Sequence, residues 1–511
     1  MAGNWISLTN KPPTGITTML LLTDGSVMCK GDDGTNPGGR GWVRLTPDAS
    51  GSYANGAWSL AASMKNARRY FASAILADGR LVIAGGEYGD AGDDLAAAEV
   101  YDPQLDAWSS MPIPSGWSAI GDASSCLLAD GRWLIGSIMT NATAIYDPRA
   151  NSWSAGPNKE DRSSEETWTL LPDGSVLTVE CFNHPRTEKY LPHENRWVTA
   201  GQVPVELVQD SSKEIGPAVL MPDGRVLAVG ATGHTAIYTS TISPSAPGGW
   251  IAGPDLPKDT NGVQLVAKDA PACLLPAGQV LCVASPYAEG VDSKSYPGPS
   301  YFFLYDGATF ATAGNPLNAG SPAFAGRLLL LPNGQVLFAN GSDTVTLYDP
   351  DGTAQANWAP TIASNPAVIT PGATHTISGM RFNGLSQAVS YGDDAAMATN
   401  YPLVRIRRPE TNSVWYCRTS NHSTMAVATG DVMVHTNFTV PNGVPDGNAV
   451  LEVVANGIPS APVQITVGPA SVGPSGGGGS GTQGRGCALR AAALGLAVVV
   501  RLIAGTAHHL A

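Results

Sequence analysis

The feature that most constrains this chain is a short motif that occurs seven times: an apolar strand, a turn containing glycine, and a second apolar strand. Two of the copies read SAILADGRLVIAGG and PAVLMPDGRVLAVG. The turn glycines are Gly25, Gly79, Gly131, Gly174, Gly224, Gly278 and Gly334. Asp-Gly or Asn-Gly between apolar runs is a strong hairpin signal, because the glycine accepts a positive φ. A spacing of roughly 40–55 residues between copies is typical of propellers and other repeat folds.

A second pair of strands follows most of the hairpins. It is visible in VYDPQLDAWSSM and IYDPRANSWSAG, where Tyr-Asp-Pro ends one strand and Trp begins the next. Seven four-stranded units close into a disc without exposed sheet edges. We therefore predict a seven-bladed kelch-type propeller over residues 1–359. The N-terminal NWISLTNKP is expected to complete the last blade, with the segment around Trp358 as the alternative.

The repeat stops near residue 360, and apolar and polar residues then alternate at strand period, as in YPLVRIRRP and VMVHTNFTVP. This pattern predicts an immunoglobulin-like β-sandwich over residues 360–468. The composition agrees with an all-β protein, since charged residues make up only 14% of the chain and there are 59 Gly and 39 Pro.

Charge and cysteine content exclude two classes of function. A formal net charge of −13 disfavours nucleic acid as a partner, which would require a basic face. Seven widely spaced cysteines without a CxxC motif disfavour a thiolate metal site. Cys273 and Cys282 lie symmetrically about Ala277-Gly278, so a two-residue turn would place them opposite each other as a disulfide or as two free core thiols.

The two ends of the chain bear on where the protein resides. The N-terminal MAGNWISLTN shows no signal peptide. Residues 469–511 read as a Gly/Ser linker followed by an apolar tail between arginines. This tail resembles bacterial sorting signals that anchor exported proteins, and the alternative is a disordered tail. We expect an exported or cell-surface protein, with a cytoplasmic one as the alternative and membrane contact only through the tail.

Three stretches of the last domain carry a family resemblance: ATNYPLVRI, VWYCRTSNHSTMAVATG and LEVVANGIPSAPVQITV. They resemble the early-set C-terminal domain of the galactose oxidase and glyoxal oxidase superfamily, and the chain looks like a bacterial member over about residues 4–467. The resemblance implies a kelch propeller followed by this sandwich. It also implies copper bound by a histidine on a C-terminal loop, onto which His422 maps, by a Tyr-His pair, and by a tyrosine cross-linked to a cysteine.

The chain departs from that family at the positions onto which the other copper-site residues map. They are Phe324 and Ala325 for the Tyr-His pair, Ser164 and Glu165 for the tyrosine, and Ser124 for the cysteine, with Cys126 two residues later. Copper(II) with one histidine has too few nitrogen ligands for its usual square geometry. We therefore expect a degenerate copper site and no cofactor, with copper or calcium as the alternatives.

The residues that open the hairpins should surround the propeller axis. Counting eight back from the first turn residue gives Ile16, Tyr70, Asp122, Glu165, Ile215, Asp269 and Ala325, with Glu214 adjacent. The candidate ligand-binding residues are Tyr70, Asp122, Glu165, Glu214, Asp269 and His422. The catalytic candidates are His422, Glu165 and Asp122, since paired carboxyl groups can divide acid and base roles. The alternative is a structural ion-pair network with Arg69, Lys213 and Lys268.

The sequence thus predicts a protein that binds a saccharide or a protein at the propeller face without redox chemistry. Two alternatives remain: a divergent copper oxidase of alcohols or aldehydes, and a non-redox sugar-active enzyme that uses the acidic residues around the axis. Fold alone does not choose among them, because propellers host unrelated functions.

Overall fold

The computed structural model describes residues 3–32, 39–291, 293–392 and 397–468. These residues form β-strands joined by loops and four single-turn 3-10 helices: η1 (Ser293–Ser295), η2 (Ala323–Ala325), η3 (Ala356–Trp358) and η4 (Pro409–Thr411). All described strands belong to one compact unit, residues 1–470. No helix in the described part of the chain has the length and apolar character needed to cross a bilayer. The expected sorting tail lies outside the described residues.

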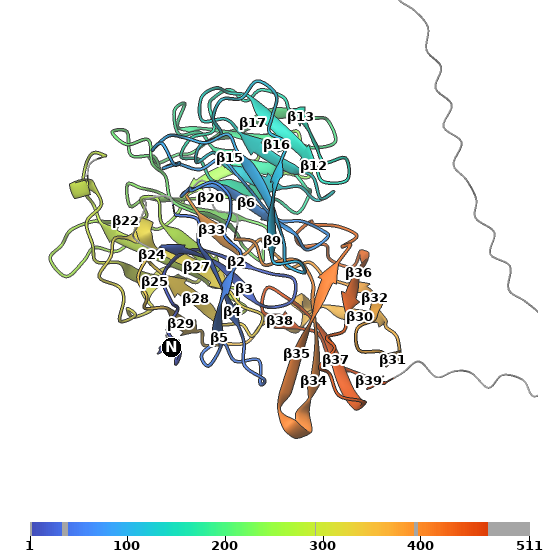
Figure 1. Cartoon of the computed structure of the whole chain (residues 1–511). Helices are drawn as coiled ribbons and strands as arrows, with labels where there is room; N and C mark the ends of the chain where they lie inside the picture. Colours follow the sequence, from blue (N-terminus) through green and yellow to red (C-terminus); the bar gives the residue numbers. More distant parts are fainter. Residues whose placement is uncertain (1–2, 33–38, 292, 393–396, 469–511) are drawn as a thin grey trace, which may run out of the picture. The chain divides into compact units, whose positions relative to one another are not determined.

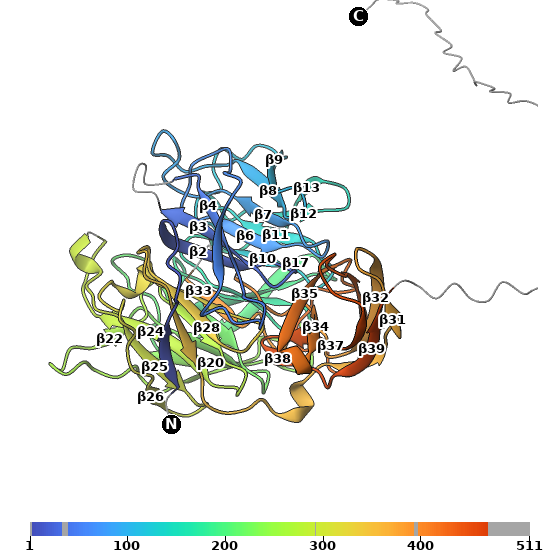
Figure 2. The same ribbon diagram turned by 60° about the horizontal axis from the view of Figure 1, so that its bottom comes forward.

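Seven antiparallel sheets form the propeller (Figures 1 and 2). The first three blades are β2 (Gly15–Leu21), β3 (Val27–Asp32), β4 (Trp42–Thr46) and β5 (Ala57–Ala61); β6 (Ala72–Ile75), β7 (Leu81–Ala84), β8 (Ala98–Asp102) and β9 (Ala107–Met111); and β10 (Ser125–Leu127), β11 (Trp133–Gly136), β12 (Thr143–Asp147) and β13 (Ser152–Ala155). The next two are β14 (Trp168–Leu170), β15 (Val176–Val179), β16 (Arg186–Leu191) and β17 (Arg196–Gln202); and β18 (Ala218–Leu220), β19 (Val226–Val229), β20 (Thr235–Thr239) and β21 (Gly249–Ala252). Blade 6 is β22 (Leu265–Val266), β23 (Pro271–Leu274), β24 (Val280–Pro286), β25 (Tyr301–Tyr305) and β26 (Phe310–Thr312), and blade 7 is β27 (Arg327–Leu330), β28 (Val336–Ala339) and β29 (Thr346–Asp349).

The seventh blade is completed by the N-terminal strand β1 (Asn4–Ser7). It pairs antiparallel with β29, with Trp5 opposite Tyr348. Trp358 lies in η3 and joins no blade. The prediction that NWIS closes the ring is confirmed, and both ends of the propeller sequence are held in one sheet.

The seven repeated hairpins share one turn geometry. In the first, the amide of Leu22 donates to the carbonyl of Ser26 and the amide of Gly25 donates to the carbonyl of Leu22. Gly25 has φ +77°, as the sequence predicts for the turn glycine. Residues 23–25 therefore form the loop between Leu22 and Ser26, and a three-residue loop of this kind is a type I turn followed by a left-handed glycine.

This turn corrects the expected register of Cys273 and Cys282. Cys273 pairs with Leu281 and Cys282 with Ala272, because the loop contains Pro276 as well as Ala277 and Gly278. A shift of one residue sends two side chains to opposite faces of a sheet. Both cysteines are free and buried.

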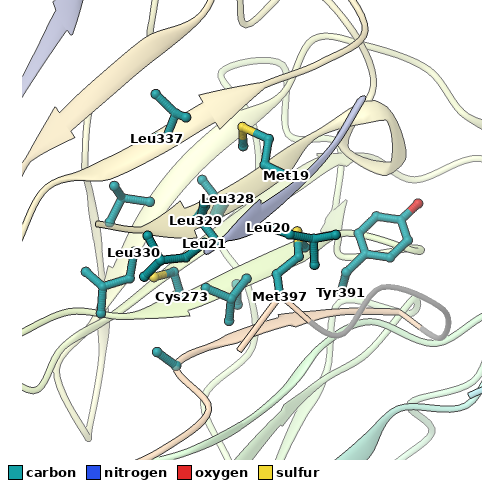
Figure 3. Close-up of a cluster of buried hydrophobic side chains, with 14 of the residues drawn as sticks. Met19, Leu20, Leu21, Cys273, Leu328, Leu329, Leu330, Leu337, Tyr391 and Met397 are labelled. Carbon is teal, nitrogen blue, oxygen red and sulfur yellow. The ribbon is translucent and has the colours of Figure 1, made fainter. Parts of the chain in front are cut away.

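The inner strands pack around the axis. β6, β10, β14, β18, β23, β27 and β2 contact one another in that order. Most of their side chains are apolar and nearly all are buried, and Figure 3 shows part of this core where β2, β23, β27 and β28 meet. The hydrophobic effect thus fixes the position of each inner strand, and with it the residue that precedes the strand.

The C-terminal sheet curls around a separate core that includes Ile377, Phe382, Val404 and Leu451. Its strands are β30 (Thr361–Ser364), β31 (Val368–Ile369), β32 (Thr374–Met380), β34 (Leu403–Arg408), β35 (Ser413–Ser420), β36 (Met433–Thr439), β37 (Gly447–Ala455), β38 (Ile458–Pro459) and β39 (Val463–Val467). This is the expected immunoglobulin-like sandwich.

One strand that follows the propeller in sequence does not stay with that sheet. β33 (Val389–Tyr391) pairs antiparallel with the inner strand β23 of blade 6. Figures 1 and 2 draw it among the propeller strands. Residues 386–392, here called the axial segment, pack against the inner strands of blades 3 to 5 around Ser125, Thr167 and Ala218. The centre of the propeller is therefore filled by chain from beyond residue 360, which the repeat pattern did not reveal.

Candidate functional site

The residues predicted to surround the axis come together at one end of the propeller. Tyr70, Asp122, Glu165, Glu214 and Asp269 line a cavity of about 330 Å³, which we call the ring cavity. Its remaining lining residues are Glu87, Tyr88, Val291, Tyr296 and Phe324. Blades 2 to 7 each contribute, and the five carboxyl and four aromatic side chains give the cavity both charge and flat apolar faces.

Four of the lining residues have a left-handed backbone, one of them Tyr88 with φ +54°. Tyr70, Glu165 and Asp269 have φ values of +47°, +66° and +50°, and each lies at the same position relative to its hairpin turn. Residues other than glycine rarely adopt this conformation, and instances that do occur cluster at functional sites. In this protein the bend precedes the inner strand, so it sets where each side chain enters the cavity.

Glu165 and Glu214 form a hydrogen-bonded pair of carboxyl groups. Burial raises the pKa of Glu165 well above its usual value, and the negative charges of Glu214, Asp122 and Asp269 add to the effect. Burial also raises the pKa of Glu214, but the hydrogen bond from Tyr296 and the charge of Lys268 oppose that rise. The contacts with Tyr296 and Lys268 therefore favour the ionised form of Glu214, and Glu165 is the member of the pair that holds a proton more readily.

Aromatic side chains enclose this pair. Tyr296 Oη donates to Glu214 Oε1 at 2.6 Å, and its ring meets Phe324 edge to face at 5.0 Å. The Tyr70 and Tyr88 rings, which also line the cavity, lie 6.1 Å apart. Neither Tyr88 nor Tyr296 was among the residues predicted from the sequence. Tyr296 lies in the long connection between β24 and β25, whose length was the only signal for it.

A second cavity of about 280 Å³ adjoins the first, since Tyr70 and Phe324 line both. Its charged lining residues are Lys30, Arg69 and Arg327. Its uncharged polar lining residues are Thr17, Thr18 and Asn340. An acidic and a basic compartment thus lie on either side of two aromatic rings.

The axial segment reaches this site through Tyr391. Its hydroxyl lies 3.0 Å from Asp269 Oδ2 and 2.8 Å from the carbonyl oxygen of Phe324. The Arg327 guanidinium stacks on the Tyr391 ring at 3.4 Å, and Thr167 donates to the carbonyl of Gly392. Figure 3 shows Tyr391 beside Met397 at the edge of the inner core. The site is therefore built by the propeller and by the chain that follows it.

His422 does not join the ring cavity, contrary to the expectation that its loop enters the pore. Its amide donates to the carbonyl of Ala77, in the hairpin turn of blade 2, so it lies at the opposite end of the inner strands. There it lines a different cavity, of about 470 Å³, with Asp78, Asp130 and His435. The loop follows β35, whose pairing with β34 and β36 keeps it in the sandwich.

The His422 imidazole is held as a neutral ring. Nδ1 lies 2.8 Å from Thr436 Oγ1, and the ring stacks on Tyr401 at 6.2 Å. Burial lowers the pKa of His422 to about 3, and the charge of Arg418 contributes. Structural packing accounts for these contacts.

Of the basic residues in the expected ion-pair network, Lys268 acts on Glu214 through its charge, and Arg69 lines the adjoining cavity. Lys213 pairs with Asp210 at 2.8 Å, outside the ring cavity. Lys268 Nζ donates to the carbonyl of Gly290 and lies 4.0 Å from the centre of the Tyr296 ring. Neither lysine lines the cavity.

A second acidic cluster lies directly behind Glu165. The next residue, Glu166, is fully buried, and Lys159 Nζ contacts it at 2.7 Å, Glu180 at 2.9 Å and Glu188 at 3.8 Å. Carboxylate oxygens of Asp161, Glu166 and Glu180 lie within 4.8 Å of one another, the one such metal-compatible group among the described residues. The ammonium of Lys159 occupies this group, so a protein cation already fills the role of an ion.

Copper does not fit the ring cavity. Its lining residues offer carboxyl and phenol oxygens but no imidazole or thiol. The four residues that follow the axial segment in sequence, 393–396, are Asp-Asp-Ala-Ala and likewise include no histidine or cysteine. Copper(II) sites need nitrogen or sulfur donors. Ser124 Oγ donates to the carbonyl of Glu166, and Cys126 is a free buried thiol in β10, so neither supplies the cross-linked cysteine.

Comparisons with known proteins agree with this fold. A model described as the Kelch motif matches residues 68–115, which span blade 2. No curated protein sequence matches the chain. A fungal alcohol oxidase of the AA5 family, solved with copper, is similar over 91% of this chain and 99% of its own, with TM-score 0.52 and 15% identity. An inactive virginiamycin B lyase from Staphylococcus aureus, solved with quinupristin, gives TM-score 0.47 and 11% identity over 67% of this chain and 97% of its own. The chain thus carries a kelch motif in a seven-bladed propeller and shares the fold of a galactose-oxidase-like copper alcohol oxidase.

Proposed function

We propose that the protein binds a saccharide in the ring cavity and carries out no redox chemistry there. The observation that supports this proposal is the lining itself, in which four aromatic and five carboxyl side chains face one space of about 330 Å³. Sugar rings stack their C–H faces on aromatic side chains, and their hydroxyl groups donate to carboxylates. The volume lies near the lower end of the range for small-molecule sites, about 300–1,000 Å³, and suits a single sugar residue.

The adjoining cavity extends this site. It shares Tyr70 and Phe324 with the ring cavity, so a ligand that passes between these two rings would place a second residue among Thr17, Thr18 and Asn340. Short oligosaccharides are therefore better ligands than monosaccharides in this proposal. The left-handed backbones at Tyr70, Glu165 and Asp269 support it further, because a fixed backbone reduces the entropy lost when a ligand binds.

Calorimetric titration with a panel of neutral and charged oligosaccharides tests the proposal. We expect Tyr70→Ala to weaken binding about 10-fold, since one stacking face is removed. Tyr287→Ala is the matched control, because Tyr287 is exposed and does not line the cavity. A panel in which no saccharide binds, or in which the two variants behave alike, would overturn the proposal.

A second candidate is a non-redox enzyme that acts on the bound sugar. The observation in its favour is the buried Glu165–Glu214 pair, in which burial raises both pKa values while the hydrogen bond from Tyr296 opposes the rise at Glu214 only. Such a pair can divide general acid and base roles. Mass spectrometry of oligosaccharides after incubation decides it: a cleaved or rearranged product that disappears in Glu165→Gln supports catalysis, and unchanged sugars rule it out.

A further inference from the structure

The ring cavity has a strongly one-sided charge. Of its ten described lining residues five carry carboxyl groups and none is basic. Cations are attracted both to carboxylates and to the faces of tyrosine rings. We infer that the saccharide bound in the ring cavity carries a positively charged primary amine. This inference rests on the proposed function and names its ligand class.

Lys159 provides a precedent for this chemistry within the same blade. Its ammonium contacts the carboxylates of Glu166 and Glu180 at 2.7 and 2.9 Å. Glu165, one residue earlier, turns into the ring cavity together with Glu214, and no lysine side chain lines that space. An amino group on the ligand would contact the carboxyl groups of Glu165 and Glu214 as the ammonium of Lys159 contacts those of Glu166 and Glu180.

The aromatic walls suit an amino sugar better than a linear amine. Tyr296 and Phe324 meet edge to face, and Tyr70 lies next to Tyr88. The aromatic lining matches the face of a pyranose ring, whereas a flexible polyamine would lose more conformational entropy and leave the rings poorly covered. The amine and the ring face are thus recognised by different parts of the lining.

Binding of a cation would also move a proton. Burial raises the pKa of Glu165, and repulsion from the charges of Glu214, Asp122 and Asp269 raises it further, so without a ligand the group favours its protonated form. A positive charge beside this pair offsets that repulsion, so Glu165 ionises and its proton passes to the buffer. Tyr296 and Lys268 act on Glu214 from the other side and do not oppose the release.

A matched pair of ligands tests the inference by calorimetry: the β-linked tetrasaccharide of glucosamine and its N-acetylated form, which differ only in the amine. We expect the amine form to bind at least 10-fold more tightly, to weaken as salt is raised, and to release a proton. Titration in two buffers of different ionisation enthalpy measures that proton. Affinity should rise with pH through the raised pKa of Glu165 and fall once the ligand amine loses its charge.

Variants separate the charge from the fold. Glu165→Gln should still bind the amine form but without proton release, while Glu194→Gln, an exposed carboxyl on an outer strand connection, should behave as wild type. Equal affinity for both tetrasaccharides would overturn the inference and leave saccharide binding intact. If spermidine or a lysine-rich peptide bound and none of the saccharides did, both the inference and the proposed saccharide binding would be overturned.

Discussion

The hydroxyl of Tyr296 donates a hydrogen bond of 2.6 Å to Glu214 Oε1, which ties the long β24–β25 connection of blade 6 to the start of blade 5. This bond favours the ionised form of Glu214 and opposes the effect of its burial. It therefore favours Glu165 over Glu214 as the protonated member of the pair.

Replacing Tyr296 by Phe removes this donor while keeping the ring. The pKa of Glu214 should then rise further above its unfolded value. Because a raised carboxyl pKa costs stability only where the unfolded group is ionised, the loss should be small at pH 4 and about 1–2 kcal/mol at pH 8. Urea unfolding at the two pH values measures it. Tyr287→Phe, whose hydroxyl donates to the exposed Glu289, serves as control, and an equal loss in both variants would contradict the role given to Tyr296.

Lys159 should be among the residues on which folding depends most. Lys159→Met leaves Glu166, Glu180 and Glu188 without their buried cation, which should cost about 3–5 kcal/mol of unfolding free energy. Arg186→Ala breaks an exposed pair with Glu160 and should cost at most about 1 kcal/mol. The comparison is read from denaturant midpoints, and similar losses would mean that the cluster does not need its lysine.

His422 should make the fold sensitive to acid without affecting the ring cavity. Its pKa is about 3 in the folded protein and 6.5 as a reference value, so the folded state binds fewer protons than the unfolded state between these limits. Stability that is present above pH 6.5 is therefore lost as pH falls toward 3. We expect His422→Gln to flatten this part of the profile and to leave saccharide affinity unchanged. A weakened affinity would place His422 at the ligand after all.

Copper should not be retained in stoichiometric amounts. After incubation with copper(II) and removal of loosely bound ions by a chelator, mass spectrometry is expected to find well below one copper per chain, because the ring cavity offers only oxygen donors. One copper per chain, with a radical absorption band and peroxide released from an alcohol, would overturn the non-redox assignment.

The repeat carried most of the fold prediction. Counting back from each turn glycine placed Tyr70, Asp122, Glu165 and Asp269 correctly because every hairpin has the same turn and the same distance to the axis. Because the register is the same in each blade, a residue at a given sequence distance from the turn glycine occupies the same place in every blade. In blade 5 the count gave Ile215, and its neighbour Glu214 is the residue that faces the cavity.

Two parts of the site carried no such signal. β33 is only three residues long, and its partner β23 lies more than a hundred residues earlier, so no local pattern indicated their pairing. Tyr296 lies in an irregular connection without a repeat to align it. His422 was misplaced for a related reason: a loop's direction depends on the strands that hold it, and β35 keeps this one at the turn end of the blades.

The pairing of β1 with β29 determines when the ring can close during synthesis of the chain. Asn4–Ser7 emerges well before its partner Thr346–Asp349, which follows about 340 residues later. At about 5–20 residues per second the first strand waits on the order of half a minute before the ring can close. The first six blades are therefore synthesised before the seventh blade can close the ring. The axial segment, which fills the centre of the propeller, emerges later still. A strand of only four residues is well suited to that wait, because so short an edge recruits foreign strands poorly.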